Sequence, residues 1–212
     1  MLDVLVIDDG SPDGTADAVK KMQNTYQRLH LEQRSGKLGL GTAYIHGFKW
    51  ALARLNYQYI LEMDADFSHN PEDLPRLVNG CMKKADVAIG SRYVNGINVV
   101  NWPMKRLLMS YFASKYVRIV TGIDIKDATA GFKCYRRSAL QKVPLNKIRF
   151  VGYAFQIEMK YTLSKYGFTI VEIPIIFTDR SEGISKMTTS IFREAFFGVI
   201  QMRLFSFFRS YR

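Results

Sequence analysis

The amino-acid sequence predicts one α/β domain, with a mostly parallel sheet covered by helices. Along most of the 212 residues, short apolar runs alternate with helical patterns. Uninterrupted apolar strands between amphipathic helices are typical of parallel sheets that are buried on both faces. Hydrophobic residues make up 48% of the chain and charged residues 23%, as in an ordinary folded domain. Three strands end in acidic or glycine-bearing turns, and such sheets bind ligands at the carboxyl ends of their strands.

Each predicted element follows from the length and period of its apolar residues. Short, nearly continuous apolar runs are assigned to strands, and longer stretches with apolar residues at helical spacing are assigned to helices. Pro71 and Pro103 suit the first turns of their helices, and Gly122 suits a C-terminal cap. The predicted elements, in chain order, are strand 2–7, helix 14–23, strand 29–32, helix 41–55, strand 57–63, helix 71–84, strand 86–90, helix 102–120, strand 131–135, helix 153–167 and strand 168–175.

The charge of the chain indicates an anionic partner. Thirty Lys and Arg residues against nineteen Asp and Glu residues give a formal net charge of +11, and the basic residues become denser after residue 102. A phosphorylated small molecule, a phospholipid surface and nucleic acid all carry the matching charge. Because no helix-turn-helix, OB or RRM pattern is visible, we expect no nucleic-acid partner.

The sequence favours an intracellular setting. Cys81 and Cys134 form no disulfide or metal-ligand framework, and Cys81 is expected to be a small core residue. The first residues lack the basic region and cleavage site of a signal peptide. No stretch approaches the roughly 20 apolar residues that a membrane-spanning helix needs.

The C-terminal segment differs from the rest of the chain. Residues 1–190 are assigned to the α/β domain, and residues 191–212 to an amphipathic helix rich in phenylalanine and arginine. Such a helix can lie in a membrane interface, where arginine meets anionic head groups, or it can dock on the domain. The density of phenylalanine favours the interfacial interpretation.

The stretch YILEMDADFSHNP places Asp64 and Asp66 at the tip of a predicted strand. Two carboxylates so close repel each other unless a cation lies between or beyond them. Hard oxygen ligands suit Mg²⁺ or Mn²⁺, and two carboxylates suffice when a diphosphate completes the coordination shell. The alternative is that Asp66 caps the turn before Pro71. The position at a strand tip favours metal binding.

Two arginines are candidates for phosphate binding. Arg92 leaves its strand at the same edge of the sheet as Asp66. Arg106 lies in the first turn of a helix, where the helix dipole does not favour a cation, so a ligand role is the better explanation. Guanidinium groups bind phosphate oxygens with two parallel hydrogen bonds. The glycine-rich stretch 34–43 is equally consistent with an anion site at a helix N-terminus and with a tight connection.

The order of seven motifs resembles that of a known family. The chain is similar to polyprenol-phosphate mannosyltransferases of the dolichol-phosphate mannose synthase type, within the family 2 glycosyltransferases of GT-A fold. The resemblance extends to about residue 190 and rests on VIDDGSPDGT, MDADFSHNPEDLP, GSRYVNG, WPMKR, GFKCYRR, GYAFQIEM and DRSEGISKM. It implies an inverting transfer of mannose from GDP-mannose to a polyprenyl phosphate, with Mg²⁺ or Mn²⁺. It also implies a peripheral enzyme on the cytoplasmic face of the membrane.

The resemblance assigns the donor site to several positions. Asp9 matches the acid that contacts the nucleotide, and the backbone of Ile7 and Ala65 lines the same site. Arg180 and Lys186 match basic residues that hold the phosphates from a mobile loop.

The catalytic and acceptor positions follow in the same way. Asp64 and Asp66 match the metal-binding aspartates, and Ser68 stands where some relatives have a glutamine that also binds the metal. Arg92 and Arg106 match arginines assigned to the acceptor phosphate, so the catalytic candidates are Asp64, Asp66 and Arg92.

The expected reaction needs no strong general base. A phosphate monoester has a second pKa near 6, so its nucleophilic oxygen is already mostly anionic at neutral pH. The three histidines have no nucleophile close by in the sequence, and we interpret His30, His46 and His69 as structural. The main requirement is electrostatic stabilisation of the leaving diphosphate.

One departure from the family concerns the N-terminus. Relatives begin with a further strand and a P-x-Y-N-E motif, and neither occurs here. The strand 2–7 is expected either to pair with 57–63 across the empty position or to leave an open edge. We therefore expect the chain to be poorly stable or prone to aggregation and to bind nucleotide weakly.

Three functions therefore compete. The first is lipid-phosphate mannosyl transfer, which the paired arginines and the DRSEGISKM stretch favour because they anticipate an anionic acceptor. The second is another family 2 transferase that uses a UDP-sugar or a different acceptor. The third is an inactive protein that binds phosphate or lipid.

Overall fold

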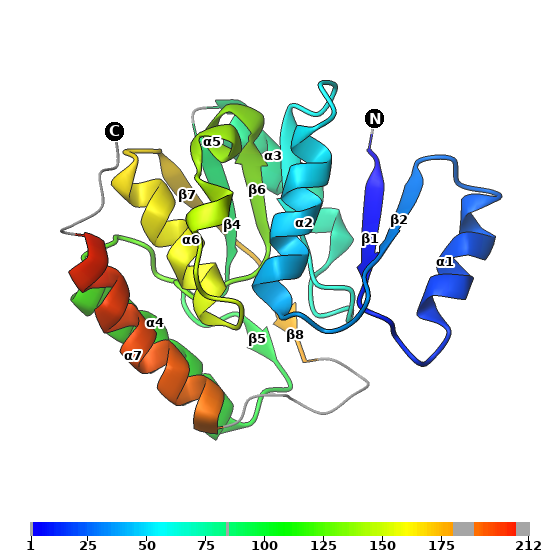
Figure 1. Ribbon diagram of the computed structural model, residues 1–212. Helices are drawn as coiled ribbons and strands as arrows, with labels where there is room; N and C mark the ends of the chain where they lie inside the picture. Colours follow the sequence, from blue (N-terminus) through cyan, green and yellow to red (C-terminus); the bar gives the residue numbers. More distant parts are fainter. Residues whose placement is uncertain (1, 84, 180–188, 207–212) are drawn as a thin grey trace.

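The computed structural model describes residues 2–83, 85–179 and 189–206, and its strands form one four-stranded sheet and two strand pairs (Figure 1). The four-stranded sheet has the order β3, β6, β4, β7, and the two pairs are β1–β2 and β5–β8. The strands are β1 (Val4–Asp8), β2 (Leu29–Gln33), β3 (Tyr59–Glu62), β4 (Val87–Ser91), β5 (Val99–Val100), β6 (Lys133–Arg136), β7 (Ile170–Pro174) and β8 (Phe177–Thr178).

The helices occur in the predicted order between these strands. The predicted helix 71–84 begins as a short 3₁₀ turn, Pro71–Asp73, and Gly122 caps α4 in the left-handed conformation with φ 74°. The short elements α5, β5 and β8 were not predicted, because they are too short to show a period. The α-helices are α1 (Thr15–Gln23), α2 (Leu40–Leu52), α3 (Leu74–Lys83), α4 (Met104–Thr121), α5 (Arg137–Lys142), α6 (Ala154–Lys165) and α7 (Thr189–Ser206).

The large sheet is buried on both faces, as the apolar strands predict. Neighbouring residues of β4 belong to different parts of the core: Val87 packs with residues of α2, α5 and α6, while Ala88 packs with Leu77 and Cys81 of α3. Successive side chains of a strand point to opposite faces, so helices cover both sides of the sheet. The expected core position of Cys81 is confirmed, since its side chain is fully buried.

β6 is antiparallel to both of its neighbours, whereas β1–β2, β4–β7 and β5–β8 are parallel. The register places Lys133, at the start of β6, opposite Glu62, at the end of β3. Lys133 is also opposite Ile89 near the end of β4. An antiparallel β6 therefore brings its first residue to the edge of the sheet where β3 and β4 end.

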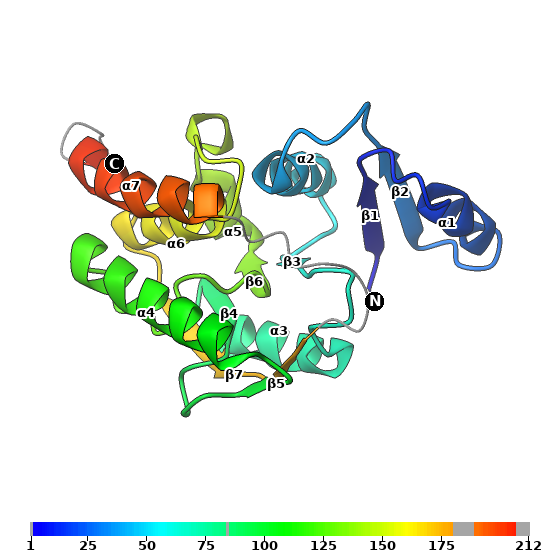
Figure 2. The ribbon, with the colours of Figure 1, turned by 90° about the horizontal axis from the view of Figure 1, so that it is seen from below.

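β1 and β2 lie to one side of the large sheet together with α1, and both views show this separation (Figures 1 and 2). Within the described residues, β1 pairs only with β2 and β3 pairs only with β6. Helix α2 contacts both β1 and β3. A Cβ added to Gly47 of α2 would lie 2.8 Å from Cδ1 of Ile7, so this glycine allows a close approach to β1. Of the two expected outcomes, pairing with β3 is not observed, and one edge of β1 has no strand partner among the described residues.

Helix α7 docks on the domain beside α4 and α6. The rings of Tyr116 in α4 and Phe196 in α7 stack with centroids 4.6 Å apart, and the Tyr116 hydroxyl donates to the Phe196 carbonyl oxygen. Val199 and Met202 are buried, while Phe197 and Leu204 on the same helix are about 60% exposed. Within the described residues, no helix is both long and apolar enough to cross a bilayer.

β1 and β3 each have one edge without a strand partner in the described part of the chain, which predicts low stability. Unpaired strand edges template pairing with another copy. We expect a midpoint of thermal unfolding below the range of about 45–65 °C that is common for mesophilic domains, together with concentration-dependent association. Calorimetry and light scattering measure both quantities. An N-terminal extension of about 30 residues that supplies a strand should raise the midpoint. A stable monomer that gains nothing from the extension would contradict this expectation.

Candidate functional site

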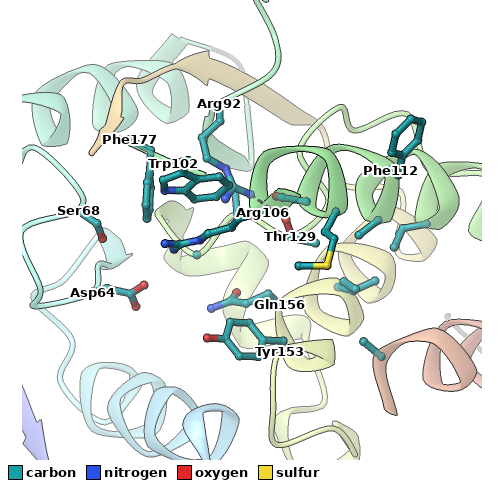
Figure 3. A pocket seen from close by; sticks show the side chains of 18 of the residues that line it. Asp64, Ser68, Arg92, Trp102, Arg106, Phe112, Thr129, Tyr153, Gln156 and Phe177 are labelled. Atoms are coloured by element: carbon teal, nitrogen blue, oxygen red, sulfur yellow. Dashed lines mark hydrogen bonds between the residues drawn. The ribbon is translucent and has the colours of Figure 1, made fainter. Parts of the chain in front are cut away.

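The predicted acidic pair lies immediately after β3, at the edge of the large sheet. Asp64 and Asp66 line a cavity of about 590 Å³ (Figure 3). Arg92, which follows β4, and Arg106, from the first turn of α4, line the same cavity. The structure thus brings together the four residues that sequence analysis assigned to the metal and the acceptor phosphate.

Asp66 holds the turn that follows it. Its Oδ1 accepts hydrogen bonds from the backbone N–H of Ser68, at 3.2 Å, and from the Ser68 hydroxyl. The intervening Phe67 has a left-handed backbone, with φ 59°, and its side chain is exposed. The turn-capping role is therefore present, and it leaves Asp66 on the wall of the cavity. Capping and ligand binding are compatible at this residue.

Asp64 is oriented by Tyr44, which sequence analysis did not identify. The Tyr44 hydroxyl donates to Oδ1 of Asp64 at 2.7 Å. The Tyr44 ring stacks on Phe155 with a centroid distance of 5.9 Å and an interplanar angle of 1°. Burial and the nearby Asp64 raise the pKa of Tyr44 well above its usual range, so the hydroxyl keeps its proton as a donor.

A buried charged cluster lies beneath the acidic pair. Lys133 is fully buried and pairs with the carboxylate of Glu62. Lys160 is also fully buried, and its Nζ donates to the carbonyl oxygens of Ala128 and Ala130 at 2.9 and 2.6 Å. Burial and the neighbouring Lys133 lower the pKa of Lys160 well below its usual range. These contacts fix the segment that leads into β6.

Arg92 is held by that segment. Nε and Nη2 of Arg92 donate to the two carboxylate oxygens of Asp127 at 2.7 and 2.6 Å, and Nη2 also donates to the Thr129 hydroxyl at 2.8 Å. Burial alone would raise the pKa of Asp127, but the charge and hydrogen bonds of Arg92 lower it overall. The guanidinium of Arg92 is therefore ion-paired within the protein. Nη1 of Arg92 forms no hydrogen bond with another residue of the described part of the chain.

Arg106 is also paired with a carboxylate. Nη1 of Arg106 donates to Asp179 at 2.6 Å, and its guanidinium carbon lies 4.2 Å from the centre of the Trp102 ring. Nε of Arg106 is buried and has no hydrogen-bond partner among the described residues. The guanidinium of Arg92 lies 5.3 Å from the same ring, so both cations face Trp102. The indole face stabilises two like charges that would otherwise repel each other.

The cavity continues from this polar end into an apolar arm between α4 and α7. The arm is lined by Phe112, Tyr116 and Val117 of α4 and by Phe196 and Val199 of α7. One continuous space therefore offers carboxylates and guanidiniums at one end and aliphatic and aromatic side chains at the other. Such a space matches an amphipathic ligand with an anionic head group.

The residues predicted to contact the nucleotide either do not line the cavity or lie outside the described residues. Asp9 follows β1 and forms two hydrogen bonds of 2.6 Å with Arg34. Asp9, Ile7 and Ala65 are not among the residues that line the cavity. Arg180 and Lys186 lie outside the described residues. The nucleotide contacts of these five residues stay predictions.

The side-chain oxygens at the end of β3 fit a hard divalent cation only if the substrate supplies further oxygen ligands. Within residues 2–83, 85–179 and 189–206, no cluster of three or more His, Cys, Asp or Glu side chains could hold a metal. Asp64 and Asp66 supply two carboxylates, and the Ser68 hydroxyl is bonded to Asp66. His69 lines the cavity and packs on Phe132 and Phe177, and burial lowers its pKa, which fits a structural role.

The sheet and its helices are those of known sugar-transferring enzymes. The chain resembles glucosyl-3-phosphoglycerate synthase from Mycobacterium tuberculosis with a TM-score of 0.63 and 15% identity, covering 94% of this chain and 68% of that one. It resembles a mannosyltransferase from Pyrobaculum calidifontis, solved with GDP-Man and Mn²⁺, with a TM-score of 0.57 and 18% identity, covering 99% of this chain and 55% of that one. These likenesses confirm the GT-A fold of glycosyltransferases.

Sequence comparison places the chain more narrowly. It is 47% identical to polyprenol monophosphomannose synthase of Mycolicibacterium smegmatis, over 93% of this chain and 75% of the relative. It is 45% identical to undecaprenyl-phosphate mannosyltransferase of Micrococcus luteus, over 95% of this chain and 82% of the relative. Residues 2–144 match the profile of Glycosyl transferase family 2, and the chain belongs to that family. The family resemblance read from the motifs is confirmed.

The buried pair of Arg92 and Asp127 gives a pH-dependent prediction. Asp127→Asn should destabilise the fold by about 3–5 kcal/mol at neutral pH, because Arg92 would stay buried without its counter-charge. The pKa of Asp127 is lowered in the folded state, so its stabilisation is present above the unfolded pKa of about 3.9 and is lost as pH falls through the folded value. Denaturant unfolding of both proteins should show a constant difference at pH 5–7 that shrinks below about pH 4.

Asp124→Asn is the matched control for this measurement. Asp124 pairs with Arg118 at 3.0 Å, but its side chain is 95% exposed. A surface pair of this kind contributes about 0–1 kcal/mol. A loss of stability in Asp127→Asn no larger than that of the control would show that the buried pair does not hold the segment.

Proposed function

We propose that the protein transfers mannose from GDP-mannose to a polyprenyl phosphate, with inversion at the anomeric carbon. The observation that carries the proposal is the single cavity with two chemically distinct ends. Its polar end holds two carboxylates and two guanidiniums, and its apolar arm runs between α4 and α7. The names of the two curated relatives and the GDP-Man complex of the structural neighbour support the same reaction.

Asp64 and Asp66 would hold Mg²⁺ or Mn²⁺ together with the diphosphate of the donor. The metal, when bound, neutralises the charge that develops on the leaving diphosphate. Tyr44 keeps one oxygen of Asp64 occupied as an acceptor, and Ser68 does the same for Asp66. Each aspartate is therefore fixed in orientation before the donor arrives, as a site that stabilises charge by position requires.

Arg92 and Arg106 would bind the phosphate of the acceptor. Both line the polar end of the cavity, and each still has N–H groups without a hydrogen-bond partner among the described residues. The acceptor phosphate is largely a dianion at neutral pH and attacks the sugar carbon without a general base. The arginines orient this nucleophile, and the apolar arm receives the first isoprene units behind it.

We propose that Asp9, Ile7 and Ala65 contact the nucleotide, and that Arg180 and Lys186 bind the donor phosphates. This part of the proposal rests on the family resemblance of the motifs that contain them. Arg34 holds the carboxylate of Asp9 at the end of β1, which gives Asp9 one fixed orientation.

We propose that α4 and α7 rest on the cytoplasmic face of a membrane and present the cavity to its lipid. Both helices carry large apolar side chains that are exposed, and they pack against each other. A peripheral helix pair with apolar residues outward can insert into the region between head groups and acyl chains. The lipid acceptor would then enter the apolar arm without crossing water.

A transfer assay with radiolabelled GDP-mannose and polyprenyl phosphate tests the proposal, with UDP-glucose as a second donor. Mannosyl transfer that requires a divalent cation is the expected result. Transfer from UDP-glucose alone would indicate a different family 2 reaction. Binding of both substrates without any transfer, also after addition of an N-terminal strand, would indicate an inactive protein.

Asp66→Asn should abolish donor binding that depends on metal. The substitution removes one of two carboxylates and keeps the hydrogen bonds that the oxygen accepts from Ser68. Calorimetry of GDP-mannose binding with and without Mn²⁺ measures the effect, and circular dichroism checks the fold. Unchanged affinity in the presence of Mn²⁺ would remove Asp66 from the metal site.

Arg106→Ala should weaken binding of the acceptor more than binding of the donor. A charge-assisted hydrogen bond contributes about 1.5–3 kcal/mol, so we expect roughly a 10- to 150-fold higher KM for polyprenyl phosphate. Lys115→Ala is the control, since it removes the same charge from an exposed position of the same helix. Arg92→Ala is a poorer probe, because it also leaves Asp127 buried without a partner. A rise in the KM of GDP-mannose alone would reassign Arg106 to the donor.

Phe197→Ser combined with Leu204→Ser should weaken membrane binding at least about tenfold, because each buried side chain contributes roughly 1.5–3 kcal/mol. Co-sedimentation with phosphatidylglycerol vesicles measures the affinity. Leu55→Ser is the matched control, because Leu55 is 90% exposed and lies after α2. Equal binding of all three proteins would place the membrane contact elsewhere.

A further inference from the structure

Gln156 is a buried polar residue at the wall of the cavity that the proposed reaction has not used. It lies in the first turn of α6, is 2% exposed and lines the cavity with its side chain. Its Nε2 has no hydrogen-bond partner among the described residues. A buried amide donor without a partner is destabilising, so its retention calls for a ligand.

The orientation of this amide is fixed by Lys133. The ammonium of Lys133 contacts Oε1 of Gln156 and also donates to the Ala130 carbonyl oxygen at 3.3 Å. An ammonium can only donate hydrogen bonds, so the amide atom that faces it must be the oxygen. Nε2 is therefore the atom that remains for the cavity.

The free amide nitrogen faces the same space as Asp64. A Cβ built on Gly131 would lie 3.6 Å from Nε2 of Gln156 and 3.6 Å from Oδ2 of Asp64. Figure 3 shows the nitrogen of Gln156 on the side of its amide that is turned toward Asp64. An N–H donor and a carboxylate acceptor thus border one small volume, and the absence of a side chain at position 131 keeps that volume open.

The charge of the donor group indicates which part of a ligand it suits. The guanidiniums of Arg92 and Arg106 lie against the Trp102 ring, whereas the amide of Gln156 lies beside Tyr153 (Figure 3). Charged donors suit phosphate oxygens, and a neutral amide suits a neutral hydroxyl. The donor substrate has two neutral parts, the nucleoside and the hexose. The residues proposed to contact the nucleotide, Ile7, Asp9 and Ala65, do not line this cavity, which leaves the hexose.

We propose that Nε2 of Gln156 donates a hydrogen bond to a hydroxyl oxygen of the donor hexose, and that Lys133 is the positioning residue that aims it. The inference rests on the proposed function, because it takes GDP-mannose as the donor. It adds a sugar-recognising contact to a site otherwise defined by metal and phosphate ligands.

Comparison of GDP-mannose with GDP isolates this contact. We expect Gln156→Met to weaken GDP-mannose binding roughly three- to tenfold and to leave GDP binding unchanged, since a neutral hydrogen bond contributes about 0.5–1.5 kcal/mol. Calorimetry with Mn²⁺ measures both affinities. Gln141→Met, on the exposed face of α5, makes the same substitution away from the cavity and should change neither. Should the methionine variant not fold, Gln156→Glu removes the donor while keeping the oxygen that faces Lys133.

Analogues of GDP-mannose that each lack one hydroxyl identify the partner. Wild-type protein should lose affinity for several of them, and for one analogue the loss should disappear in Gln156→Met, because the partner of that hydroxyl is already gone. If the loss of affinity caused by Gln156→Met adds to the loss caused by the missing hydroxyl for every analogue, the inference is overturned. An equal loss of GDP affinity in Gln156→Met would also overturn it, because the residue would then act through the nucleotide or the fold.

The outcome is separable from that of the proposed function. Coupling between Gln156 and one hydroxyl, in a protein that transfers no mannose to polyprenyl phosphate, would support the contact and contradict the acceptor. Transfer activity without any such coupling would support the reaction and contradict the contact.

Discussion

The candidate site depends on the ion pair between Glu62 and Lys133, which joins the end of β3 to the start of β6. The antiparallel register sets these two residues opposite each other, and both are buried. Transfer of each charge out of water costs several kcal/mol, and the pair offsets this only with good geometry and further hydrogen bonds. Lys133 forms such further hydrogen bonds, to the carbonyl oxygen of Ala130 and to Oε1 of Gln156. Asp64 lies two residues beyond Glu62, so the pair fixes the base from which the acidic turn departs.

Lys160 extends the same constraint to the other side of the cavity. Its Nζ donates hydrogen bonds to the carbonyl oxygens of Ala128 and Ala130. The carboxylate of Glu172 accepts a hydrogen bond of 2.8 Å from the backbone N–H of Asp127. The segment 127–131 is thereby held from within the core. It contains Asp127, which forms an ion pair with Arg92, and Gly131, which leaves space beside Asp64. One buried polar network therefore sets the relative positions of the predicted metal ligands and a predicted phosphate ligand.

The α/β fold could be predicted because its long elements have clear periods and its strand exits share one edge. The motifs also predicted that Asp64, Asp66, Arg92 and Arg106 belong to one site. The antiparallel β6 could not be predicted, because an apolar run such as GFKCY shows no strand direction. The partners Tyr44, Asp127 and Gln156 were missed, since each lies far along the chain from the residue that it contacts. A signal did exist: Lys133 stands in an apolar strand, and Lys160 in a segment whose neighbours are apolar, so both predict buried charge that needs partners.

The pairing of both arginines with carboxylates decides what kind of anion the site can hold. Free guanidiniums in a cavity would attract any anion, whereas Arg92 and Arg106 are each largely neutralised by Asp127 and Asp179. What remains is a set of N–H donors in fixed directions, stacked against Trp102. A ligand must then match these directions, because little net attraction is left to hold one that does not. It must also place an apolar chain between α4 and α7 to gain further free energy from burial. A polyprenyl phosphate meets both conditions, whereas inorganic phosphate and nucleic acid meet at most one.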